Sequence, residues 1–234
     1  RPLISAEIAA RDPALARLRS MPQARFDRLT SWMNGLQLYL RRDVPILRGH
    51  LFYPDAPWAL TSVSQPQFWR EGGALEERYG DGAVRGLISV DISDWESRGT
   101  FVRKAARDCT PEEVSSEVFQ QLRAALRDRG GPLLREEDLV CFHLDDELER
   151  RGGGLFSHAR LLVHPPGSWH DRPEAATGLA NLTLAADYVR THTDLASMEG
   201  ANEAARRAVN AILARRGRAA EACTVWPLRE PALF

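Results

Sequence analysis

The feature that most constrains the fold is a pattern near the C-terminus, over residues 181–205. The apolar run 182–185 is typical of a buried strand, and it ends in Ala186-Asp187-Tyr188. A polar connection follows, and we expect a helix to begin near Met198-Glu199-Gly200-Ala201. The first N–H groups of a helix are unpaired and carry a partial positive charge. The pattern therefore predicts a site for a polar, electron-accepting ligand beside a carboxylate.

This ordered pattern resembles the C-terminal flavin-binding motif of FAD-dependent amine oxidases and carotenoid (phytoene) desaturases. That motif reads apolar-apolar-Ala-Gly-Asp, then about ten residues, then Met-Glu-Gly-Ala. This chain has Ala186 where the family usually has Gly, so a methyl group is expected near the ribityl chain. For single residues the alternative is structural, with Asp187 capping a turn and Met198 filling core. The resemblance implies FAD as cofactor, with contacts from Ala186, Asp187, Tyr188, Met198, Glu199, Gly200 and Ala201.

The resembled enzymes bind ADP through an N-terminal Gly-rich strand–turn–helix unit. The nearest candidate here, residues 80–86, is one residue too long for G-x-G-x-x-G and follows no buried strand, so we interpret it as a surface turn. The chain also begins at Arg1. We expect the C-terminal part of a flavoprotein, whose partner is a G-x-G-x-x-G-containing FAD-binding chain or segment that was cleaved, encoded separately or lost.

The expected fold class is α+β for most of the chain, with a C-terminal strand and helix that belong to an α/β, Rossmann-like domain. Residues 1–171 are predicted to form a substrate-binding domain with a mixed sheet and helices. Residues 172–216 are predicted to add one strand and one helix to a Rossmann-like FAD-binding domain that the missing part mostly supplies. Residues 217–234 are expected to be a C-terminal tail.

Local signals place the individual elements. Thr110, Pro111 and Glu113 form a capping-box pattern, which predicts a helix from there to Gly130-Gly131. Leu36, Leu38 and Leu40 alternate as on one face of a strand. The expected elements are a helical stretch over 5–28 broken at Pro13 and Pro22, strands at 29–40, 49–54, 58–65, 86–95, 155–163 and 181–186, and a last helix at 198–215.

Residues 31–69 resemble the substrate-domain sheet of desaturase-like bacterial proteins. Aromatic residues concentrate there, and Trp32, Tyr39 and Trp58 are candidates to line an apolar substrate pocket. Core packing is the equally weighted alternative. An amine oxidase would instead need an aromatic cage near the flavin, to which Trp169 and Tyr188 are candidates to contribute.

Composition excludes several classes. A net charge of −1, from 31 basic and 32 acidic residues, gives no case for nucleic-acid binding. No run of 18 apolar residues exists, so no transmembrane segment is expected. Three cysteines without metal or disulfide spacing favour a reducing, cytoplasmic location, with peripheral membrane association left open. His158 and His164 lack a third ligand at metal spacing, so no metal site is predicted. Ser62 and Ser64 lack the nucleophile-elbow context of a hydrolase. The acidic run 145–149 is interpreted as a solvated helix start and not as a catalytic pair.

These observations favour part of an FAD-dependent oxidoreductase. Its predicted reaction takes a hydride from an apolar, isoprenoid-like substrate, as in a desaturase. A flavin amine oxidase is the first alternative, and a non-catalytic partner subunit or binding module is the second. No catalytic acid–base group is identified, because in such enzymes the cofactor carries most of the chemistry.

Overall fold

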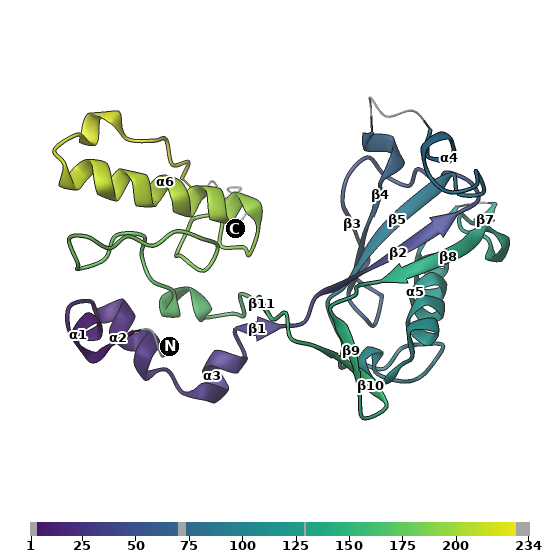
Figure 1. The fold of residues 1–234 in the computed structure, drawn as a ribbon, viewed down its shortest axis with the longest axis horizontal. Coiled ribbons are helices and arrows are strands. Elements are labelled where there is room, and N and C mark those ends of the chain that lie inside the picture. Colours follow the sequence, from purple (N-terminus) through teal and green to yellow (C-terminus); the bar gives the residue numbers. More distant parts are fainter. Residues whose placement is uncertain (1–3, 70–73, 129, 228–234) are drawn as a thin grey trace. The chain divides into compact units, whose positions relative to one another are not determined.

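The computed structural model describes residues 4–69, 74–128 and 130–227 (Figure 1). The chain divides into two compact units. The sheet unit is Trp32–Arg160, and the helical unit combines Arg1–Ser31 with Leu161–Phe234. These units are defined by contacts within the chain, whereas the predicted domains were defined by their roles in binding substrate and cofactor. The predicted domain limits at 171 and 216 therefore stay a prediction.

A five-stranded sheet forms the centre of the sheet unit (Figure 1). Its order is β3-β4-β5-β2-β8, and every neighbouring pair is antiparallel. The α+β class is thus confirmed, while a mixed sheet was wrong. The crossover through α5 links β5 to β8, which both flank β2, so it creates no adjacent parallel pair. The bounds are β2 Asn34–Leu40, β3 Leu51–Phe52, β4 Leu60–Ser64, β5 Gly86–Ile92 and β8 Leu139–Leu144.

One face of this sheet carries the main core. Leu36, Leu38 and Leu40 are fully buried, which confirms the predicted alternation. Leu36 lies opposite Val90, and Leu38 lies opposite Ile88. The buried face of α5 completes this core. Each leucine contributes about 2 kcal/mol by leaving water.

Helix α5 (Pro111–Ala125) begins as predicted. The Glu113 N–H donates to Thr110 Oγ1 at 3.2 Å, and the Thr110 N–H donates to the Glu113 carboxylate at 3.0 Å. The predicted end at Gly130-Gly131 was wrong. The chain leaves the helix at Leu126 because the next residues pair in the hairpin of β6 (Arg127–Asp128) and β7 (Gly131–Pro132).

Two predicted strands are divided. The stretch 155–163 splits into β10 (Gly154–Ser157) and β11 (Leu161–Leu162), and the stretch 29–40 splits into β1 (Thr30–Ser31) and β2. Strand β10 pairs with β9 (Leu148–Arg151), and β1 pairs with β11. The acidic run spans the turn between β8 and β9 and the first residues of β9, and Asp145 accepts a hydrogen bond from the Glu147 N–H at 3.0 Å. Its assignment to a helix start was therefore wrong.

The helical unit begins with three short helices, α1 (Ala6–Ala10), α2 (Pro13–Ser20) and α3 (Gln23–Asp27). The breaks fall beside Pro13 and Pro22, as predicted. No helix of the described residues combines the length and apolar character needed to cross a bilayer. The remaining helices are α4 (Leu75–Arg78) and the 3₁₀ turns Pro66–Phe68, Ala106–Asp108, Glu136–Asp138, Ser168–Asp171 and Ala219–Glu221.

The last helix, α6, spans Met198–Arg215 and matches the prediction. The predicted strand at 181–186 does not form. Thr183 makes only an isolated bridge with Ala176. Leu184 and Val189 instead pack in a small core with alanines of α6. In the described part of the chain no strand lies beside this segment, so it has no hydrogen-bonding ladder to join.

Candidate functional site

The N-terminus of α6 leaves two backbone donors open. Ser197 caps the helix, since its Oγ accepts from the Gly200 N–H at 3.2 Å and its carbonyl accepts from the Ala201 N–H at 3.0 Å. The N–H groups of Met198 and Glu199 have no hydrogen-bond partner among the described residues. These two donors therefore remain available to a ligand. The cap at Ser197 was not predicted, although a serine before a helix start is a recognisable signal.

Gly200 lies close to the backbone of the turn that leads into α6. A Cβ at this position would lie 2.5 Å from the Leu195 carbonyl oxygen, so only glycine fits there. The Leu195 backbone occupies the space that a side chain at this position would need. Gly200 thus fixes the connection that leads into the helix.

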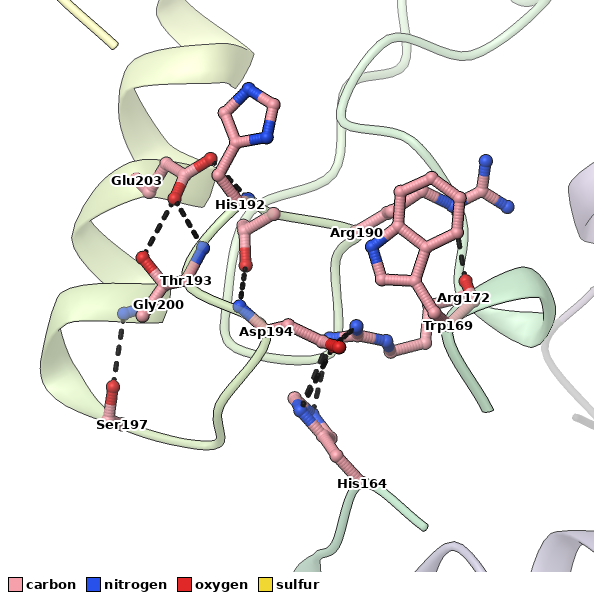
Figure 2. A network of polar contacts seen from close by, with 11 residues as sticks. His164, Trp169, Arg172, Arg190, His192, Thr193, Asp194, Ser197, Gly200 and Glu203 are labelled. Carbon is pink, nitrogen blue, oxygen red and sulfur yellow. Dashed lines mark hydrogen bonds and ion pairs between the residues drawn. The ribbon is translucent and has the colours of Figure 1, made fainter. Parts of the chain in front are cut away.

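Glu203 holds the loop 191–194 against α6 (Figure 2). Its carboxylate accepts from the His192 N–H at 2.7 Å, from the Thr193 N–H at 3.0 Å and from the Thr193 hydroxyl at 2.8 Å. Arg207 pairs with it at 2.8 Å. Burial by itself raises the pKa of Glu203, but these hydrogen bonds outweigh it and lower the pKa from 4.5 to about 2. The loop is therefore tied to an ionised carboxylate at neutral pH.

A second polar group lies next to this loop. The buried guanidinium of Arg172 pairs with Asp194, and it approaches the His164 ring at 3.3 Å (Figure 2). Burial lowers the pKa of His164, the charge of Arg172 lowers it further, and the charge of Asp187 opposes this. His164 is therefore neutral at neutral pH. Glu203, Arg172 and Asp194 were not predicted, because isolated charged residues form no sequence pattern before their partners are known.

A cavity of about 590 Å³ opens beside the start of α6. It combines the first turns of the helix, the loop that Glu203 holds and a short piece of the tail. Among the predicted cofactor residues, Met198 and Glu199 line it. The lining residues are His192, Thr193, Met198, Glu199, Asn202, Glu203, Arg206, Trp226 and Pro227.

The other predicted cofactor residues lie outside that lining. Gly200 and Ala201 belong to the helix start, with the hydrogen bonds described above. Asp187 is partly buried, and its carboxylate makes no hydrogen bond within the described part of the chain. Tyr188 is exposed, although partial burial raises its pKa. Ala186 has a φ of +148°, which a residue with a side chain rarely adopts and glycine adopts readily. The binding roles of these residues stay a prediction.

The sheet unit has a second cavity, of about 620 Å³ and mostly apolar walls. Exposed Leu47, Phe52 and Phe101 contribute to it. Its polar lining includes Gln121, whose buried Oε1 has no hydrogen-bond partner among the residues that the structure describes. The remaining lining comes from Ile46, Leu51, Tyr53, Pro54, Asp55, Ala56, Pro57, Thr100, Ala124, Ala125 and Leu126.

The three predicted substrate residues do not line this second cavity. Trp58 is fully buried, and its indole N–H donates to the Ser97 carbonyl at 3.0 Å. Trp32 packs against other aromatic rings, and the Tyr39 hydroxyl donates to Gln37 at 2.6 Å. Their substrate roles stay a prediction. Within the described residues, no group of three His, Cys, Asp or Glu side chains is placed to hold a metal ion.

Two N–H groups at a helix start lie next to a cavity, on the same unit as Asp187, whose carboxylate makes no hydrogen bond within the described residues. This combination defines a class of site that suits polar, electron-accepting ligands. A family model described as flavin containing amine oxidoreductase matches residues 50–213. The chain belongs to this family of flavin-containing oxidoreductases. Searches of curated proteins and of solved structures find no match to it.

Proposed function

We propose that this chain forms the flavin-ring side of an FAD-dependent oxidoreductase. The observation that carries the proposal is the pair of open N–H groups at Met198 and Glu199, beside the 590 Å³ cavity, in a chain of a flavin-containing family. The donors fit the cofactor, because a flavin ring presents carbonyl oxygens and gathers negative charge when it is reduced. A helix N-terminus stabilises such charge by up to about 2 kcal/mol in a partly buried site.

Each residue then has a defined task. The N–H groups of Met198 and Glu199 would hold the polar end of the ring, and the Asp187 carboxylate would accept hydrogen bonds from ribityl hydroxyls. Glu203 keeps His192 and Thr193 in place as cavity walls. When bound, FAD supplies the acceptor for the hydride that leaves the substrate. The protein contributes orientation and exclusion of water.

The ADP half of FAD requires a Gly-rich phosphate-binding turn. No segment of this sequence has that turn in the required strand–helix context. We therefore propose that a G-x-G-x-x-G-containing segment or partner chain completes the site. Failure of the isolated 234 residues to retain FAD would be consistent with this requirement.

Our first choice of substrate is an apolar, isoprenoid-like molecule. The mostly apolar walls of the sheet-unit cavity support this choice, since long hydrocarbon chains bind in such pockets. An amine is the second choice, and one observation weighs against it. The Arg190 guanidinium lies 4.3 Å from the centre of the Trp169 ring, so one candidate cage face already holds a cation.

The test uses the complete polypeptide that carries these residues, with any partner chain that co-purifies. The oxidised protein should be yellow with the visible spectrum of bound flavin. A protein that stays colourless after incubation with FAD would contradict the proposal. Anaerobic addition of a polyene precursor or of a primary amine then separates the two substrate classes, because only the true class bleaches the flavin. Flavin that neither class reduces would favour the non-catalytic partner.

A variant pair tests the role of Asp187. Asp187→Ala should weaken FAD binding about tenfold, because the ribityl hydroxyls lose a charged acceptor worth about 1.4 kcal/mol. Asp146→Asn in the sheet unit is the matched control, since the Asp146 side chain is 91% exposed. Equal dissociation constants for Asp187→Ala and Asp146→Asn would remove Asp187 from the proposed site.

A further inference from the structure

The segment after α6 runs back along the helix toward its N-terminus. The Asn210 side-chain amide donates to the Cys223 carbonyl at 2.9 Å and accepts from the Cys223 N–H at 2.7 Å. Arg206, one turn earlier in the helix, donates to the Thr224 carbonyl at 3.2 Å. Three hydrogen bonds thus hold Cys223 and Thr224 against α6, and we call residues 222–227 the tail.

The tail brings Trp226 to the cavity at the helix start. Trp226 and Pro227 line that cavity together with Met198, Glu199 and Asn202 of α6. The Arg206 guanidinium lies 4.9 Å from the centre of the Trp226 ring and also bonds to Asn202 at 2.9 Å. The ring is therefore held by the helix on one side and borders the cavity.

Trp226 remains 64% exposed, although the backbone two residues earlier, at Thr224, is hydrogen-bonded to Arg206. A tryptophan that merely covered the helix would bury most of its large apolar surface. Arg206 has no carboxylate partner among the described residues, and its contacts are with an amide oxygen, a carbonyl and the Trp226 ring. The arrangement therefore presents an ordered, unfilled aromatic surface to the cavity.

We propose that Trp226 is a cofactor-positioning residue, which packs against the planar ring of the flavin, and that the Asn210 clamp places it there. This inference rests on the proposed function. It adds a binding residue that lies outside the region matched by the family model, since that match ends at residue 213. Stacking of a heteroaromatic ring on an aromatic side chain changes affinity by about ten- to a hundredfold.

The ligand class follows from the surfaces that meet at the cavity. The helix start offers hydrogen-bond donors to a polar edge, and Trp226 offers a flat apolar face. A planar heteroaromatic ring with a polar edge satisfies both. Two carboxylates, Glu199 and Glu203, also line the cavity. Arg207 forms an ion pair with Glu203 and balances its charge, and the positive charge of Arg206 in the same lining offsets that of Glu199.

The experiment measures FAD binding to the complete protein by flavin fluorescence. Trp226→Ala should raise the dissociation constant for FAD about tenfold or more, with Trp226→Phe between it and the wild type. It should also brighten the bound flavin, because a nearby indole quenches flavin emission. Asn210→Ala should shift both quantities in the same direction, since it frees the tail without replacing any residue that lines the cavity. Trp69→Ala, which removes an exposed tryptophan of the sheet unit, is the matched control and should change neither.

Two outcomes would overturn the inference, and they are distinguishable. If the wild type binds FAD while Trp226→Ala and Asn210→Ala retain its affinity and emission, the proposed function stands and the role of Trp226 falls. If the wild type binds no FAD, both fall together. Thermal unfolding of each variant is recorded, and Trp226→Phe keeps the test decisive should the alanine variant fail to fold.

Discussion

Replacing Glu203 by glutamine tests how the cavity wall is held. The substitution keeps the shape of the side chain. It replaces one of the two carboxylate oxygens that accept hydrogen bonds from the loop with an amide group, and it removes the negative charge. The drop in pKa from 4.5 to about 2 corresponds to about 3 kcal/mol of stabilisation at neutral pH, at 1.36 kcal/mol per pKa unit. The residue is only 9% exposed, so little of this is lost to solvent screening. We expect Glu203→Gln to lower the free energy of unfolding at pH 7 by about 2–3 kcal/mol.

The pH dependence gives a sharper test. Because the folded-state pKa of Glu203 is depressed, its contribution is complete above the unfolded value of 4.5 and is lost as the pH falls toward about 2. The difference between wild type and variant should therefore shrink across that window. Urea unfolding at several pH values measures it, and amide hydrogen exchange at His192 and Thr193 reports the local release. Glu7→Gln, in the exposed first turn of α1, is the control. A loss below about 0.5 kcal/mol, the usual range for surface changes, or a loss independent of pH, would refute the reasoning.

Three further outcomes are expected. Ala186→Gly should raise the thermal midpoint, with a gain of about 1 kcal/mol, because glycine relieves the φ of +148°; a lower midpoint would contradict this. Gly86→Ala should destabilise the sheet unit by about 2 kcal/mol or more in urea unfolding, since its Cβ would lie 2.3 Å from the Arg42 carbonyl; unchanged stability would count against that contact. Cys141 should react with a thiol reagent at pH 8 while Cys109 stays protected, because burial raises the pKa of Cys109 to about 11; mass mapping of equal labelling would disprove it.

Local signals predicted the elements that depend on near neighbours in the chain. The capping box at Thr110 and Glu113 formed because both partners lie within one helical turn. The alternation at Leu36, Leu38 and Leu40 could be predicted because, in a strand with one buried face, apolar side chains recur every two residues. Helix α6 was predicted over its observed span for the same kind of reason.

Other features depend on groups far apart in the sequence. The end of α5 was set by the hairpin that follows it. The stretch 181–186 forms no strand because, among the described residues, its ladder pairing is limited to the isolated bridge between Thr183 and Ala176. Glu203 and His192 are eleven residues apart, and Arg172 meets Asp194 only through the fold. No helical or strand periodicity in the sequence predicts such pairs.

The sequence by itself predicted a flavin-type motif from a helix start and an acidic residue, because their spacing and residue types lie in one short segment. Only the tertiary structure decided which surfaces meet at that helix start. The tail carries Trp226 back along α6 through the side chains of Asn210 and Arg206, and the loop is held by one ionised carboxylate. The physical reason is that a hydrogen bond or a ring contact depends on distance in space, whereas a sequence pattern records only distance along the chain.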